Sequence, residues 1–191
     1  MNELENGDNI GRMIGEYYKG EDHVPVGFLI HGAVFYGTTA RDNVAEKVLR
    51  ENYSNIDIVA SKGFIQIENA YKVCKDMITS HPQIRALYIS WDRPALQAIK
   101  ALKELGREDI AVFTTDLDID IAKTMKDGIV KGLSTQRPYE QGKAAALAVL
   151  KSLVSNDVPK YIGVQPYIVN INHLKQAWKD IFYEALPSDL I

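Results

Sequence analysis

Residues 86–95 read Ala86-Leu87-Tyr88-Ile89-Ser90-Trp91-Asp92-Arg93-Pro94-Ala95. Four apolar residues in a row are typical of a strand that is buried on both faces of a sheet. Asp92 can accept hydrogen bonds from the first free backbone N–H groups of a helix, and Pro94 is tolerated in a first turn. The stretch therefore predicts a buried strand that leads directly into a helix.

The same order of strand and helix recurs on both sides of this stretch. Further apolar runs predict strands at residues 24–30, 56–60, 110–114, 129–134 and 167–169. Helical periodicity and end signals predict helices at residues 38–53, 65–79, 95–105, 121–126, 138–154 and 172–183. Gly106 suits a left-handed helix end. This alternation predicts the α/β class: a doubly wound, mostly parallel sheet with helices on both faces.

Length and composition limit the classes of protein that need to be considered. The 191 residues suffice for one well-buried core, or for one core and part of a second. A net charge of -3 does not indicate the basic surface that binds nucleic acid, so we expect no nucleic-acid partner. No stretch approaches the ~18 apolar residues of a membrane span, and residues 1–6 do not resemble an export signal. The single Cys74 predicts a packed thiol without an internal disulfide.

The ends of the strands are the places to look for a site. Ligands of open α/β sheets bind in the crevice beyond the carboxyl ends of the strands. The segments that follow the strands here are residues 31–41, 61–64, 90–92, 115–118 and 135–137. These segments predict the position of a ligand site.

Two aromatic residues in these segments are candidates for contact with a sugar ring. Trp91 offers a flat apolar face and one N–H donor, and Phe64 offers a second stacking face. Packing in the core remains an alternative for both. Asp92 is more simply explained as the cap of the following helix.

Three polar residues complete the set of candidates. Asp116 follows a strand directly, where its carboxylate could accept hydrogen bonds from two vicinal hydroxyls, although a helix cap or a solvated loop acid is an alternative. Gln136 can both donate and accept, but a loop glutamine without a role stays open. Arg41 lies in the first turn of its predicted helix, where a cation does not favour the helix dipole. A functional reason and a solvated arginine both remain open for it.

Motifs of catalysis are missing or incomplete. The sequence contains no G-x-S-x-G, no G-x-G-x-x-G and no phosphate loop, and its four histidines are scattered. Residues 116–120 are similar to the D-x-D motif of haloacid-dehalogenase-like phosphatases, but they lie mid-chain with Asp120 in place of Thr or Val. Ile121 stands where a calcium-binding loop needs glycine. We therefore expect no catalytic residue, no metal and no cofactor, and a phosphatase remains a minor alternative.

Several segments together resemble the ribose-type periplasmic binding proteins of ABC sugar importers. The matching stretches are residues 38–41, Phe64, 81–95, 98–106, 109–116, 127–128 and 135–142. The resemblance implies that Arg41 is the sugar-contacting arginine, Phe64 the stacking phenylalanine, Asp116 the binding-site aspartate and Gln136 the hinge glutamine. Trp91 departs from the family, which usually has asparagine at this position. The resemblance therefore leaves the identity of the ligand open.

The resemblance also implies a function without catalysis. It implies binding of a small sugar or polyol in a cleft between two lobes, a membrane permease of an ABC importer as partner, and an extracytoplasmic parent protein whose export signal is absent from this chain. The runner-up is the effector-binding core of a lactose-repressor-like regulator, although residues 106–109 lack the Pro-Asp pair usual there.

The same resemblance implies a division of the chain. We expect residues 1–136 to form the C-terminal lobe, residues 137–170 to be a helix and strand orphaned from a missing N-terminal lobe, and residues 171–191 to be a return segment and helix. The orphaned helix would expose an apolar face, so we expect a homo-oligomer, a domain swap or an altered packing of this helix. That face comprises Ala144, Leu147, Leu150 and Leu153.

Overall fold

A computed structural model of the chain describes residues 2–155 and 158–190. Its elements in chain order are α1 (Glu3–Tyr17), β1 (Val24–His31), α2 (Tyr36–Asn52), β2 (Ile56–Phe64), α3 (Asn69–Ser80), β3 (Ala86–Ile89), α4 (Asp92–Glu104), β4 (Ala111–Thr115), α5 (Ile119–Lys126), β5 (Val130–Thr135), α6 (Pro138–Val154), β6 (Tyr167–Val169), α7 (Leu174–Phe182) and the short 3₁₀ turn η1 (Ser188–Leu190). None of the helices in these described ranges has the length and hydropathy that a bilayer crossing requires.

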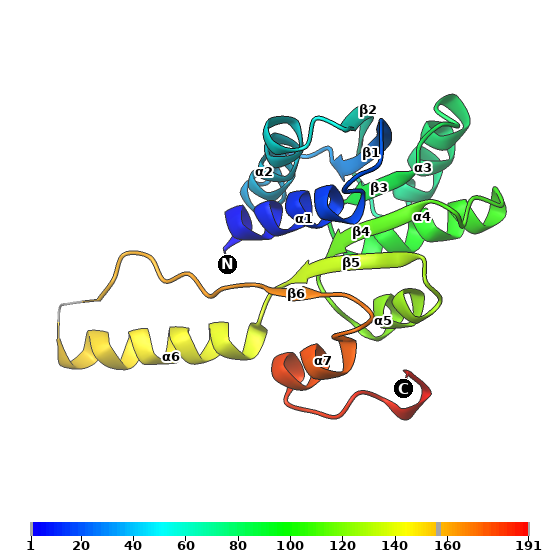
Figure 1. Cartoon of the computed structure of the whole chain (residues 1–191). Coiled ribbons are helices and arrows are strands. Elements are labelled where there is room, and N and C mark those ends of the chain that lie inside the picture. The colour runs from blue at the N-terminus through cyan, green and yellow to red at the C-terminus, as the bar shows by residue number, and fades with distance from the viewer. Residues whose placement is uncertain (1, 156–157, 191) are drawn as a thin grey trace.

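The six strands form one sheet in the order β2-β1-β3-β4-β5-β6 (Figure 1). The first five are parallel, and β6 pairs antiparallel with β5. Alternate strand residues point to opposite faces: Tyr88 and Phe113 pack under α1 and α2, whereas Leu87 and Val112 join the core beneath α3, α4, α5 and α7. The prediction of a doubly wound, mostly parallel α/β sheet is confirmed.

Several predicted boundaries needed correction. Strand β2 continues to Phe64, because residues 60–64 pair with β1 as far as His31. Helix α3 accordingly begins at Asn69 rather than at residue 65. Gly106 has φ +64, which confirms the left-handed helix end. Cys74 is fully buried, and burial raises the pKa of its thiol to about 12, as a packed thiol requires.

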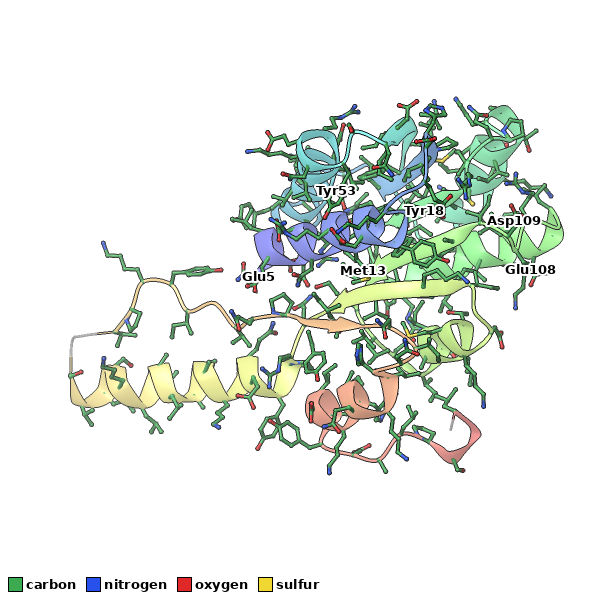
Figure 2. All side chains as sticks on the ribbon, viewed as in Figure 1. Glu5, Met13, Tyr18, Tyr53, Glu108 and Asp109 are labelled. Carbon is green, nitrogen blue, oxygen red and sulfur yellow. The ribbon has the colours of Figure 1, made fainter. Side chains whose placement is uncertain are left out.

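Helix α1, which the sequence did not predict, packs unusually close to α2. Gly7, Gly11 and Gly15 recur every four residues and form one face of the helix. A Cβ added at Gly7 would lie 2.3 Å from the carbonyl oxygen of Arg41, and one at Gly15 would lie 2.4 Å from the ring of Tyr53. Figure 2 shows Tyr53 beside this helix. The glycines thus let two backbones approach, and this contact sets the position of Arg41.

Helix α6 leaves the sheet after β5 and extends away from the body as an arm (Figure 1). None of the described residues 138–154 is buried, and Leu147, Leu150 and Leu153 are 58%, 60% and 77% exposed. The expected exposed apolar face is therefore present, with Ala144 half-buried. The strand at 167–169 was expected to be orphaned as well. That expectation is wrong, since β6 pairs with β5 and Val169 is fully buried in the main core.

Candidate ligand-binding site

Arg41 lies in the second turn of α2 and not, as expected, in the first, and it is 4% exposed. Its Nε and Nη2 donate to Glu3 Oε2 at 2.8 and 2.5 Å. Its Nη1 donates to the carbonyl of Ser90 at 2.6 Å and to the hydroxyl of Thr115. The alternative of a solvated arginine is therefore wrong: the guanidinium ties α1, α2, β3 and β4 together at the carboxyl edge of the sheet.

Glu3 is a site residue that the sequence analysis missed. It lies at the first position of α1 and is 5% exposed, and its carboxylate contacts Arg41 thirty-eight residues further along the chain. Such a contact leaves no local signal. The glycine repeat in α1 was the available clue, because it predicts a close helix contact that would bring the start of α1 to the strand ends.

A second buried carboxylate lies below the same edge. Asp42 accepts a hydrogen bond from the hydroxyl of Tyr88 at 2.6 Å and from the hydroxyl of Ser90 at 2.9 Å. The backbone N–H of His31 donates to Ser90 Oγ at 3.2 Å. Burial raises the pKa of Asp42, and these hydrogen bonds offset part of the rise. The network fixes the ends of β1 and β3 relative to α2.

Asp116 is more accessible than Glu3 and Asp42. It has φ +68, a left-handed conformation, and its side chain is 30% exposed. Gln136 Nε2 donates to its Oδ1 at 3.3 Å, while Arg41 Nη1 lies 3.9 Å from its Oδ2. Burial raises the pKa of Asp116, and the charge of Arg41 partly offsets this. The helix-cap alternative is wrong, because Asp118 is the residue that caps α5.

Gln136 lies beside Asp116 at the start of the connection to α6. Its Oε1 accepts a hydrogen bond from Gln141 Nε2 at 3.2 Å, so α6 orients the amide. A pocket of about 220 Å³ opens next to these two side chains. It is lined by Asp116, Leu117, Thr135, Gln136, Pro138, Ile181 and Phe182. The arrangement places one carboxylate and one amide in the lining of a small, mainly apolar pocket.

Aromatic side chains occupy the other half of the edge. The rings of His31, Phe64 and Trp91 lie 5.2–5.9 Å apart between centroids. Phe64 is 1% exposed, so the core alternative describes it in this structure, and Trp91 above it is half-buried. His31 was not among the candidates, although it ends β1. Its Nδ1 lies 3.2 Å from Thr38 Oγ1, which fixes the ring between α2 and Trp91.

Asp92 differs slightly from its expected role. Trp91 occupies the N-cap position of α4, and Asp92 is the first helical residue. Its Oδ1 accepts from the backbone N–H of Arg93 at 2.7 Å, so the carboxylate still serves the helix start. Burial raises the pKa of Asp92 to about 6. The N-cap position therefore lies at Trp91, one residue before the predicted Asp92.

The acidic side chains of residues 116–120 each contact side chains of the protein itself. Asp118 and Asp120 both pair with Arg93, at 2.9 and 3.7 Å. Within residues 2–155 and 158–190, no cluster of three His, Cys, Asp or Glu side chains is arranged to hold a metal ion. The geometry of these acids thus follows from ion pairing between α4 and α5.

Comparisons with known proteins agree with this architecture. Residues 1–156 match a family model described as periplasmic binding protein domain. Ribose import binding protein RbsB of Salmonella typhimurium is 33% identical over 70 residues, which cover 37% of this chain and 24% of that protein. The protein of Escherichia coli K12 is 31% identical over a stretch of the same length. The match therefore spans about a quarter of the length of these curated relatives.

Solved structures share the fold over nearly the whole chain. A periplasmic solute binding protein from Actinobacillus succinogenes, solved with D-allose, superposes with a TM-score of 0.80 at 23% identity, over 92% of this chain and 62% of that one. The binding protein of the arabinose ABC transporter from Shewanella sp. ANA-3 gives 0.83 at 22% identity, over 94% and 60%. With the family model covering residues 1–156, the chain belongs to the periplasmic binding protein family.

Proposed function

We propose that the carboxyl edge of this sheet binds a small sugar or polyol, without catalysis, as part of a receptor for an ABC-type importer. The observation that carries the proposal is the convergence of Arg41, Trp91, Asp116 and Gln136 on one edge, with an aromatic face at one side and a carboxylate and an amide at the other. A sugar presents the same division between its C–H face and its hydroxyls. Solved relatives carry D-allose and arabinofuranose, which supports this ligand class.

Each candidate residue has a distinct role in this proposal. The partly exposed carboxylate of Asp116 accepts from ligand hydroxyls, and the Gln136 amide both donates and accepts. Trp91 packs against the ring of the ligand, and Phe64 supports Trp91 from below. Arg41 orders the strand ends from beneath. Trp91 takes the place of an amide, so one side of the ligand meets an apolar surface there.

The wider protein follows from the same proposal. A second lobe completes the cleft, the closed form docks on a membrane permease, and the parent protein is extracytoplasmic. Residues 1–136 then belong to the C-terminal lobe and residues 171–191 to the return segment. Residues 137–170 approach the other lobe through α6, whose exposed apolar side chains support this assignment. In the absence of such a lobe, these side chains favour a homo-oligomer.

An effector-binding core of a lactose-repressor-like regulator would share this fold. The relatives described above are import and transport proteins, which favours the receptor over the regulator. A phosphatase has weaker support, since Asp118 and Asp120 are paired with Arg93.

A binding screen tests the proposal. We expect at least one pentose, hexose or cyclitol at millimolar concentration to raise the melting temperature of the chain, since a ligand that binds only the folded state stabilises it. D116N should remove that shift, and D76N, an exposed neutralisation on α3 paired with Lys72, should retain it. A shift that persists in D116N would exclude this edge, and no shift with any of these compounds, either in this chain or in a protein that supplies the second lobe, would contradict the sugar assignment.

A further inference from the structure

The charges beneath the binding edge are unequal. In the described chain, the network of hydrogen bonds and ion pairs around Arg41 contains three carboxylates, those of Glu3, Asp42 and Asp116, and one guanidinium. Glu3 and Arg41 side chains are each 5% exposed, whereas the Asp116 side chain is 30% exposed. The Arg41 guanidinium is therefore enclosed, and a ligand at this edge would contact the Asp116 carboxylate.

Arg41 also uses most of its N–H donors in hydrogen bonds within the protein. A guanidinium has five N–H donors, and four hydrogen bonds from Arg41 go to Glu3, to the Ser90 carbonyl and to Thr115. Two of these go to a single oxygen of Glu3, which fixes the fork and balances its charge. Asp116 Oδ2 lies 3.9 Å from Nη1, too far for a hydrogen bond, while Oδ1 accepts one from Gln136, so the carboxylate can still accept hydrogen bonds from a ligand.

We propose that Glu3 is a positioning residue that commits Arg41 to the protein and thereby makes this edge select neutral, hydroxyl-rich ligands over acidic sugars. The inference rests on the proposed function and adds the charge of the ligand to it. A uronate would need an accessible cation, and it would meet the Asp116 carboxylate instead of the enclosed Arg41 guanidinium. A neutral sugar satisfies that same carboxylate with its hydroxyl donors.

Matched pairs of sugars test the selection in the unaltered chain. D-galactose and D-galacturonate, and D-glucose and D-glucuronate, differ by one carboxylate and are titrated by NMR at millimolar concentration. We expect the neutral member of a bound pair to bind on the order of tenfold more tightly or better. Uronates that bind as tightly as their neutral partners would overturn the inference while leaving sugar binding intact.

The variant E3Q tests the role of Glu3 itself. Glutamine keeps an acceptor for Arg41 but removes the charge, so the preference for the neutral sugar should narrow by about tenfold. E5Q, an equal neutralisation two residues further along α1, should keep the wild-type preference. An unchanged preference in E3Q would remove Glu3 from the argument. If E3Q does not fold, the unaltered chain still tests the selection, and uronates that bind as tightly as neutral sugars would overturn the inference.

A measurement without ligand separates this inference from the proposed function. The Glu3 charge raises the pKa of Asp116, so E3Q should lower the midpoint of the Asp116 titration by NMR, and E5Q should leave it in place. If no sugar of either charge binds, the proposed function fails. The Asp116 titration then still decides whether Glu3 sets the charge at this edge, and an unchanged midpoint in E3Q would overturn that.

Discussion

Asp92 is the residue whose environment gives the clearest dependence on pH. Burial raises its pKa from 3.8 to about 6. Because the folded chain holds this proton more tightly than the unfolded chain, the contribution of Asp92 to stability falls as pH rises from about 4 to about 6. We expect D92N to flatten the dependence of melting temperature on pH in this window. The half-exposed side chain makes the effect modest, and an Asp92 NMR midpoint near 4 would contradict it.

At the residue scale, sequence reasoning succeeded where a site residue follows its own strand. Asp116 and Gln136 were found because each stands directly after a buried strand, and the ends of parallel strands meet at one edge. Glu3 was missed because its partner lies 38 residues away. The burial of Arg41 also escaped prediction, since it depends on an acid supplied by another helix.

Among the elements, the central residues of the strands were predicted correctly, whereas several ends of strands and helices were not. Residues 86–89 form β3 as expected, because four consecutive apolar residues leave few alternatives to a buried strand. The extension of β2 to Phe64 depends on its pairing with β1, which the local sequence does not contain. Helix α1 was missed for a different reason: three glycines lower the intrinsic helix propensity of residues 3–17. Tertiary packing against α2 compensates for them.

The packing of α1 on α2 predicts the effect of a small substitution. In G7A, the new Cβ would lie 2.3 Å from the carbonyl oxygen of Arg41, so the two helices must separate. We expect a loss of about 1–3 kcal/mol in the free energy of unfolding, measured with urea. G142A on α6 is the matched control, because nothing lies within 4 Å of its added Cβ and alanine favours a helix. Equal stability of G7A and wild type would show that the helices are not in close contact.

For the whole molecule, the exposed arm of α6 should govern self-association. Leu150 and Leu153 are 60% and 77% exposed, so L150E and L153E together remove apolar surface without opening a cavity. We expect the unaltered chain to associate at micromolar concentrations in sedimentation experiments, and the double variant to sediment as a monomer.

The stability of the two forms separates this effect from unfolding. The free energy of unfolding should change by no more than about 0.5 kcal/mol in the double variant, because none of the described residues of α6 is buried. S54E and Q83E, placed in exposed loops near β2 and β3, add the same charge and should leave association unchanged. A wild-type chain that is monomeric at every concentration would show that α6 stands exposed without a partner in solution, and the arm would then have no part in assembly.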